Sequence, residues 1–255
     1  MMTIRDDHSL AADLATEAGQ LLLEIREGFD DPAGLRARGD RAAHEHLRKA
    51  LALLRPSDSV LSEEATREER MDPRRLTAER VWIVDPLDGT REYAEEGRAD
   101  WAVHVALWER GKLAAGAVAL PAQGRTLTTG RPPVLPRWEE GKSRFRIAVS
   151  RSRPPEFVQK LAYLVGADLV PIGSAGAKIS AVLTGEVEAY VHAGGQYEWD
   201  SAAPVAVAQA AGAWTSRIDG SEPTYNQADP SLPDILVSLP ELASTLLAGI
   251  RDLHR

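Results

Sequence analysis

The sequence predicts a protein with an α+β first half and an α/β second half. The first half combines two amphipathic helical segments with a run of strands joined by short turns. The second half alternates strand and helix signals three times, which predicts a layered sheet with ligand sites at the strand ends. Between the halves, residues 130–143 are rich in Pro and Gly and lack periodicity. We therefore expect one domain over residues 1–140 and a second over residues 141–255.

Composition and charge narrow the class of protein. With 255 residues, 44% of them hydrophobic and 27% charged, the chain has the composition of an ordinary globular protein. The absence of cysteine excludes disulfides, thiolate metal sites and a cysteine nucleophile. A formal net charge of -8 argues against binding to a nucleic-acid polymer, which needs a basic surface. The polar start of the sequence and the lack of a run of roughly 20 apolar residues predict a cytoplasmic protein without a membrane segment.

Two helices are predicted before the first strand. Apolar residues at three- and four-residue spacings predict a helix over residues 9–27 that ends near Gly28. Residues 30–40 are polar and rich in turn-forming residues, which predicts a mobile loop and makes this stretch a candidate lid. A second helix is predicted over residues 41–54. Asp40 stands directly before it and is a candidate N-cap.

A short strand is predicted from Ser59, and it runs into two adjacent glutamates, Glu63 and Glu64. Neighbouring residues on an extended strand point to opposite faces. We therefore expect at most one of the two carboxylates to face any given site. The alternative interpretation is a solvated acidic strand end.

A meander of strands is predicted after residue 100. Residues 101–108 alternate cleanly and return through a short turn as residues 113–120, and residues 125–129 add a third strand. His104 lies among apolar residues of the first of these strands. We interpret it as a core histidine with satisfied hydrogen bonds rather than as a ligand.

Strands and helices alternate in the second half. Pro154 or Pro155 is expected in the first turn of one helix, and Ser174 opens the next. Asp200 lies at the start of the last of these helices, with Pro204 expected in its first turn. The predicted segments are strands over residues 145–150, 167–173 and 186–193, and helices over residues 154–166, 174–185 and 199–212.

The stretch VWIVDPLDGT, residues 81–90, carries the clearest chemical signal. Its apolar start reads as a buried strand that ends in two carboxylates, Asp85 and Asp88, on a turn stiffened by proline. Two acids on a rigid turn suit a hard divalent cation, and the backbone N–H groups of Gly89 and Thr90 suit an anion. Taken alone, the same residues also fit an ordinary surface turn.

Several acids fall at the ends of predicted elements. If they converge, their repulsion requires either partial protonation or a bound cation, and the cation is favoured. An all-oxygen site selects Mg2+ or Mn2+ rather than zinc, and two such ions about 3.5–4 Å apart can bind a phosphoryl group and activate water. These acids are Asp40, Glu63, Glu64, Asp85, Asp88 and Asp200.

Three motifs match a known family in its order. They are the pair Glu63 and Glu64, the block DPLDGT over residues 85–90, and the block WDSAA over residues 199–203 with a following Ala-Gly. Over roughly residues 9–240 the chain resembles the inositol monophosphatase superfamily of Mg2+-dependent, lithium-sensitive phosphatases. The resemblance implies an alternating αβαβα layered sandwich with the site between the halves and a small phosphate ester as substrate. A homodimer is a possible assembly, because dimers are frequent among members of the family.

The resemblance also implies roles for the matched residues. Glu63 and Asp85 would bridge metal ions with Glu64 nearby, the Leu87 carbonyl would complete one ion, and two or three Mg2+ ions would be held, with Mn2+ as a substitute. The implied catalytic residues are Asp40, Glu63 and Thr90, where Asp40 and the Thr90 hydroxyl orient the attacking water. The implied metal ligands are Glu63, Asp85, Leu87, Asp88 and Asp200. The implied substrate contacts around the phosphate are Leu87, Asp88, Gly89, Thr90 and Asp200.

Further segments favour the branch of 3'(2'),5'-bisphosphate nucleotidases of CysQ type. The segment VSRSR resembles that branch's S-R-S-H, and GSAGAK resembles its G-S-S-x-K with one inserted residue. Ser174 and Lys178 would bind a second phosphate, which needs a cation away from the metal ions. The alternative for Lys178 is a solvated helix lysine. Gly173, Arg151 and Arg153, the last in place of the usual His, are additional candidates.

The expected reaction is hydrolysis of adenosine 3',5'-bisphosphate to AMP and phosphate. Alternatives are an inositol-1-phosphate or fructose-1,6-bisphosphate phosphatase and, from another class, a non-catalytic metal-dependent sensor of phosphate ligands. The inositol enzymes carry an acid about seven residues before the aspartate of the Trp-Asp block. Here His192 and Ala193 stand there, which weakens the inositol alternative, although Glu198 is close.

Overall fold

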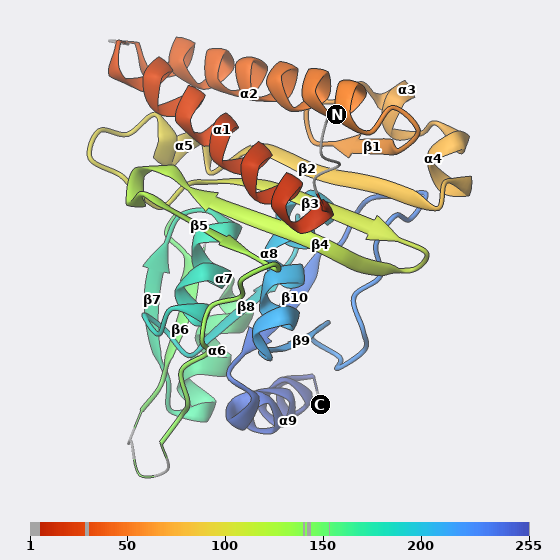
Figure 1. Cartoon of the computed structure of the whole chain (residues 1–255). Helices are drawn as coiled ribbons and strands as arrows, with labels where there is room; N and C mark the ends of the chain where they lie inside the picture. Colours follow the sequence, from red (N-terminus) through yellow and green to blue (C-terminus); the bar gives the residue numbers. More distant parts are fainter. Residues whose placement is uncertain (1–5, 29–30, 140, 142–143, 153, 255) are drawn as a thin grey trace.

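Five layers build the molecule in the order helix, sheet, helix, sheet, helix (Figure 1). The computed structural model describes residues 6–28, 31–139, 141, 144–152 and 154–254. Helices α1 and α2 form one outer layer, α7 and α8 lie between the two sheets, and α6 and α9 form the other outer layer. The αβαβα sandwich implied by the resemblance is confirmed.

The first sheet has its strands in sequence order, β1-β2-β3-β4-β5. β1 and β2 pair in parallel and the remaining pairs are antiparallel. The alternation expected after residue 100 holds: Trp101, Val103, Val105 and Leu107 are buried against α1 and α2. The strands are β1 Ser59–Ser62, β2 Arg80–Asp88, β3 Ala102–Glu109, β4 Lys112–Leu120 and β5 Arg125–Thr128.

The stretch predicted as a mobile loop is helical, and this prediction was wrong. α1 spans Asp7–Glu27 as expected, but α2 spans Pro32–Leu54. The side chain of Asp31 accepts hydrogen bonds from the N–H groups of Ala33 and Gly34, with a proline at the first helical position. Asp40 is therefore not an N-cap but lies inside α2, and residues 31–40 are not a loop that could serve as a lid.

A glycine inside α2 explains how the helix reaches the sheet. A Cβ at Gly39 would lie 2.7 Å from the Tyr93 ring and 3.1 Å from the Leu87 side chain. Glycine weakens a helix interior by roughly 1 kcal/mol relative to alanine, but here it allows close packing. That packing places the next residue, Asp40, beside the residues that follow β2.

The second sheet has the order β7-β6-β8-β10-β9. β6 is parallel to β7 and β8, whereas β10 is antiparallel to β8 and β9. The strands are β6 Arg146–Ser150, β7 Asp168–Ile172, β8 Ala189–Ala193, β9 Trp214–Ser216 and β10 Asp234–Ser238. The last two strands and α9, Ala243–Leu253, carried no sequence prediction.

The helices of the second half follow their predicted positions closely. α6 spans Glu156–Val165, α7 Ala175–Leu183 and α8 Glu198–Ala211. Ser174 caps α7 as expected, but Pro204 lies inside α8 rather than in its first turn. The short elements are α3 Arg67–Arg70, α4 Pro73–Thr77, α5 Thr90–Tyr93, η1 Pro121–Gln123 and η2 Pro240–Leu242.

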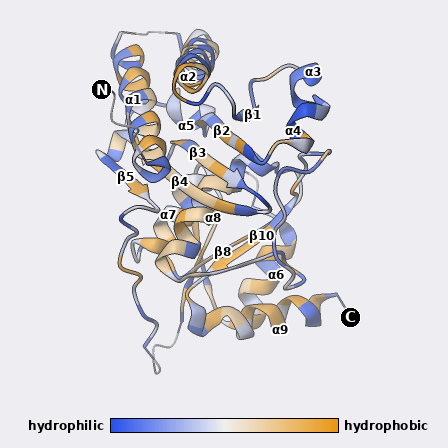
Figure 2. Cartoon of the chain, turned by 45° about the vertical axis from the view of Figure 1, so that its right-hand side comes forward, coloured by the Kyte–Doolittle hydropathy of each residue, from blue (hydrophilic) through white to orange (hydrophobic). Residues whose placement is uncertain are grey.

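One apolar core joins the two halves of the chain. It contains Ile83 and Val118 of the first sheet, Ile179 of α7, Val205 of α8 and Val237 of the second sheet. Hydrophobic colour accordingly follows α7 and α8, whereas α3 and α4 are hydrophilic (Figure 2). Each half builds its own sheet, but this core is shared by both halves. The division into two domains near residue 140 therefore stays a prediction. Among the described helices, none is both long and apolar enough to cross a membrane.

Candidate active site

A cavity of about 610 Å3 opens at the edge where both sheets end. Its lining includes residues at the carboxyl ends of β2, β6 and β8 and at the amino ends of α7 and α8. Strand ends and helix starts bring polar backbone and side-chain groups together, which is where α/β proteins bind ligands. The middle helical layer, formed by α7 and α8, therefore supplies part of the cavity lining, and the end of β2 in the first sheet supplies another part.

Three carboxylates meet in this cavity. Asp85, Asp88 and Asp200 each offer an oxygen, and these atoms all lie within 4.8 Å of one another. On a regular strand, residues three apart would face opposite sides. The register of β2 against β3 shifts between Asp85 and Asp88, which lets both carboxylates turn toward Asp200.

Each of these carboxylates is held by protein donors. Asp85 accepts from the N–H of Leu87 at 3.1 Å, and Asp200 accepts from the N–H of Tyr197 at 2.7 Å. Asp88 accepts from the N–H of Gly176 at 2.7 Å. Backbone donors restrict the rotation of each side chain, so the acids are oriented before any ligand arrives.

Burial and mutual repulsion perturb these acids in different directions. Burial raises the pKa of Asp200 to about 7, with the charge of Asp88 adding to the effect. Burial and the charge of Glu63 raise the pKa of Asp85 well above its usual range. Burial alone would also raise the pKa of Asp88, but the charge and hydrogen bond of His104 leave it lowered.

The arrangement of Asp85, Asp88 and Asp200 suits a bound metal ion. The three acids crowd into a small volume, and the resulting repulsion is relieved by protons or by a cation. Their donor atoms are all oxygens, which suits a hard divalent ion. Asp85 is only 1% exposed, so its charge has little compensation from water. This cluster could therefore hold a metal ion.

Glu63 joins the cluster from the end of β1. It lines the cavity and shares a hydrogen bond with Asp85. Although the residue as a whole is exposed, its carboxyl lies among other acids. Burial of that group, with the charges of Asp88 and Glu64, raises its pKa to about 7. Glu64 is exposed and is absent from the described lining.

Thr90 belongs to the described cavity lining, whereas Asp40 lies outside it. Thr90 lines the cavity with Gly89, whose φ of 86° allows the turn into α5. The first N–H groups of a helix have no partner within the helix, so those of α5 are available to a ligand. Asp40 is half-buried and outside the described lining. Burial and the charge of Glu64 raise its pKa to about 7.

Lys178 lines the same cavity as the acids. It is 4% exposed, which rules out the solvated helix lysine considered above. Its ammonium donates to the carbonyl of Gly173 and lies 5.4 Å from the Tyr190 ring centroid. Burial lowers its pKa, while Asp88 and Glu92 favour the charged form.

Ser174 lines the same part of the cavity as Lys178. It is buried, and its hydroxyl oxygen accepts from the N–H of Ala177 at 2.9 Å as the N-cap of α7. The hydroxyl proton remains able to donate to a ligand in the cavity. The N-cap geometry thus orients Ser174 and, one turn later, Lys178 toward the same space.

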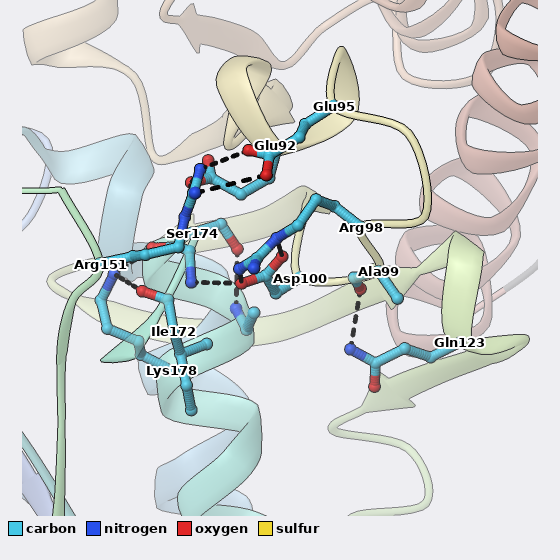
Figure 3. A network of polar contacts seen from close by, with 12 residues as sticks. Glu92, Glu95, Arg98, Ala99, Asp100, Gln123, Arg151, Ile172, Ser174 and Lys178 are labelled. Atoms are coloured by element: carbon cyan, nitrogen blue, oxygen red, sulfur yellow. Dashed lines mark hydrogen bonds and ion pairs between the residues drawn. The ribbon is translucent and has the colours of Figure 1, made fainter. Parts of the chain in front are cut away.

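A polar network connects this region to the first half of the chain (Figure 3). The N–H of Gly173 donates to the Asp100 carboxylate at 2.6 Å, and Arg98 also donates to that carboxylate. A Cβ at Gly173 would lie 2.7 Å from the Asp100 carbonyl oxygen, so the two segments meet closely only because this residue is glycine.

Arg151 has a weaker connection with the cavity. It donates to Glu92 at 3.1 Å and to Glu95 at 2.7 Å, which places its guanidinium between two acids (Figure 3). Within the described residues it does not belong to the cavity lining. Arg153, the other basic candidate of this segment, lies outside the described residues.

Sequence reasoning missed the remaining wall. Tyr190, His192 and Gln196 line the cavity, and the Gln196 amide donates to the Tyr190 hydroxyl at 2.9 Å. Only His192 had been noted, by its spacing before Asp200, whereas no local pattern marked Tyr190 or Gln196. Glu198, mentioned above as a nearby acid, is buried and accepts from the N–H groups of Asn226 and Gln227, and it is not among the described lining residues.

The chain is similar to known proteins over nearly its whole length. The family model described as inositol monophosphatase family matches residues 8–254. The 3'-phosphoadenosine 5'-phosphate phosphatase of Mycobacterium leprae (strain TN) is 50% identical over 268 aligned residues, covering 96% of this chain and 94% of that protein. The 3'(2'),5'-bisphosphate nucleotidase CysQ of Escherichia coli (strain K12) is 30% identical, covering 89% and 97%. The solved structure of Mycobacterium tuberculosis SuhB has a TM-score of 0.74 and 27% identity, covering 96% and 95%.

Proposed function

The chain belongs to the inositol monophosphatase family, and we propose that it hydrolyses the 3'-phosphate of adenosine 3',5'-bisphosphate to give AMP and phosphate. The observation that carries the proposal is a buried cation, Lys178, lining the same cavity as the carboxylates of Asp85, Asp88 and Asp200. A substrate with two phosphates needs two separate centres of positive charge. Lys178 supplies one, and the acids would gather cations for the other.

Magnesium is the proposed cofactor, with Mn2+ as a substitute. Two or three ions would be held by oxygen atoms alone, as the donor set favours. Bound there, the ions would supply positive charge to the phosphoryl oxygens and lower the pKa of a coordinated water. The proposed ligands are Glu63, Asp85, the Leu87 carbonyl, Asp88 and Asp200.

The protein's own groups would place the substrate and the water. The N–H groups of Gly89 and Thr90 would donate to the oxygens of the phosphate under attack. The hydroxyl of Thr90 would hold the attacking water, with the Asp40 carboxylate accepting its proton directly or through another water. This role for Asp40 is supported by its raised pKa and by its electrostatic influence on Glu63.

The second phosphate would lie against α7. Lys178 would donate to it from Nζ and Ser174 from its hydroxyl. The Arg98–Asp100 pair would keep the Gly173 segment in place by holding its N–H. Arg151 is committed to Glu92 and Glu95 and is proposed at most as a peripheral contact.

The arrangement disfavours inositol phosphates as the preferred substrate. At the position where the inositol enzymes are expected to carry an acid, this chain has His192 and Ala193, which both line the cavity. Glu198 cannot replace that acid, because backbone N–H groups already bind its carboxylate. A sugar hydroxyl would therefore lack its acidic acceptor here.

A panel of substrates tests the proposal. Phosphate release with Mg2+ would be measured on adenosine 3',5'-bisphosphate, inositol 1-phosphate and fructose 1,6-bisphosphate, and kcat/KM compared. We expect the highest value for the bisphosphate nucleotide. A higher value for either sugar phosphate would overturn the substrate assignment, and no phosphate release from any of them would overturn the catalytic one.

A further inference from the structure

His104 sits behind the acidic cluster rather than in the cavity. It lies in β3, is 0% exposed, and is absent from the described cavity lining. Its Nε2 lies 3.2 Å from Oδ2 of Asp88, and its Nδ1 lies 3.0 Å from the carbonyl oxygen of Trp199. We propose that His104 is a positioning residue that sets the Asp88 carboxylate for metal binding, an inference that rests on the proposed function.

The two oxygens of Asp88 are placed in different surroundings. Oδ2 lies between Nε2 of His104, at 3.2 Å, and the N–H of Gly176, which donates at 2.7 Å. With Oδ2 occupied on the protein side, Oδ1 is the oxygen that the geometry offers to a cation. Partners that orient a metal ligand in this way also tune its affinity, typically by 10–100-fold.

Helix α7 packs closely against the imidazole of His104. A Cβ at Gly176 would overlap Nε2 of His104 and would lie 3.0 Å from the Cβ of Ala102. Helix α7 therefore reaches Asp88 closely only because Gly176 has no side chain. Gly176 thus donates its own N–H to Asp88 and leaves room for the imidazole of His104.

The other ring nitrogen extends the effect to Asp200. Nδ1 faces the carbonyl of Trp199, the residue directly before Asp200 in α8. A backbone carbonyl can only accept, so this nitrogen carries the donated proton. One imidazole therefore relates the end of β2 to the start of α8, which are the elements that supply Asp88 and Asp200.

Three substitutions separate positioning from core packing. His104→Leu removes both ring nitrogens, His104→Gln keeps an N–H donor, and Val118→Ala is the control. Val118 pairs with His104 across the sheet and is buried, but it does not contact Asp88 through a hydrogen bond. The readout is Mn2+ affinity of the chelator-treated protein by titration calorimetry, with folding checked by circular dichroism.

We expect His104→Leu to bind Mn2+ roughly 10–100-fold more weakly. His104→Gln should recover much of that loss. Val118→Ala should lower the melting temperature and leave the affinity unchanged. A folded His104→Leu protein with wild-type affinity would overturn the inference, as would an equal loss in Val118→Ala.

A double variant tests whether His104 acts through Asp88. Asp88→Asn alone should weaken Mn2+ binding, and adding His104→Leu to it should cost less than it does in the wild-type background. If Asp88→Asn leaves the affinity unchanged, the proposed metal site itself fails. If Asp88→Asn weakens binding but His104→Leu does not, only the role of His104 fails.

A further measurement follows the wild-type protein and uses a variant only to assign one signal. Histidine ring signals of 15N-labelled protein would be followed while Mg2+ is added, with His104 assigned through His104→Gln. We expect the His104 ring signals to shift, while those of His8, which is hydrogen-bonded to Thr129, stay in place. Ring signals of His104 that do not respond to Mg2+ would overturn the inference.

Discussion

The two walls of the cavity carry opposite charge and are balanced in different ways. The acidic wall, formed by Glu63, Asp85, Asp88 and Asp200, places like charges together, and three of these four pKa values are raised. The basic wall, formed by Ser174 and Lys178, is completed by carbonyl oxygens and the Tyr190 ring. The difference indicates that the repulsion in the acidic wall is relieved by protons or by a bound cation, whereas the charge of Lys178 in the basic wall already has protein partners.

The largest expected effect comes from the acidic wall. Asp88→Asn keeps the shape of the side chain but removes the charge of a proposed metal ligand. We expect kcat/KM to fall more than the roughly 10–100-fold typical of residues that only orient a ligand, with the fold retained. Steady-state kinetics with circular dichroism checks this. Full turnover in a folded variant would show that Asp88 binds no essential metal ion.

A substitution in the basic wall should lower kcat/KM for a substrate with two phosphates more than for a substrate with one. Lys178→Met removes a charged donor, and such hydrogen bonds contribute about 1.5–3 kcal/mol, which corresponds to roughly 10–100-fold. We expect that loss in kcat/KM for adenosine 3',5'-bisphosphate and little loss for 3'-AMP, which lacks the 5'-phosphate. The control is Lys160→Met, because Lys160 is exposed and pairs with Glu156. Equal losses on both nucleotides would remove Lys178 from the second-phosphate site.

The stability of the metal-free protein should depend on pH in a defined direction. The pKa values of Asp40, Glu63 and Asp200 are raised to about 7 by burial first, and then by neighbouring acids. A carboxyl with a raised folded-state pKa stabilises the fold at low pH and loses that contribution as pH rises through the folded pKa. We expect the melting temperature of chelated protein to fall between about pH 5 and pH 8, and Mg2+ to restore it most at the upper end.

Differential scanning calorimetry would measure the melting temperature between about pH 5 and pH 8, once with EDTA and once with Mg2+. Asp200→Asn should flatten the pH dependence of the chelated protein, because it removes one of the titrating groups. The same pH dependence with and without Mg2+ would mean that the acidic wall does not hold the ion.

The smallest effect concerns the helix that carries Asp40. Asp31→Ala removes the N-cap of α2, which typically costs about 0.5–2 kcal/mol. We expect a melting temperature lower by about 2–4 °C for each kcal/mol, and kcat unchanged, because the cap lies about 2.5 turns from Asp40. Lys49→Ala, which removes only an exposed i,i+4 pair worth about 0.3–0.5 kcal/mol, is the matched control. A large fall in kcat for Asp31→Ala would instead favour a gating role for this end of the helix.

The sequence located elements well where local signals agreed. The alternation of residues 101–108 predicted β3 because one face of that strand is buried against helices. The prediction from local pattern was wrong for residues 31–40, where Pro32, Gly34 and Gly39 are residue types common in turns. Asp31 caps the helix and Gly39 packs against Tyr93, and the second of these facts depends on a segment more than 50 residues away. β9 and β10 carried no prediction, and they are identified only by their pairing with β8 and with each other.

The sequence by itself determined the part of the acidic wall that lies on one turn, because Asp85 and Asp88 are three residues apart along the chain, directly before Gly89 and Thr90. Tertiary structure alone decided the rest of the cavity. It buried Lys178, withdrew Glu198 from the lining and placed His104 against Asp88. These outcomes depend on how α7 and α8 pack between the sheets, and contacts between residues far apart in sequence leave no spacing that a local pattern can record.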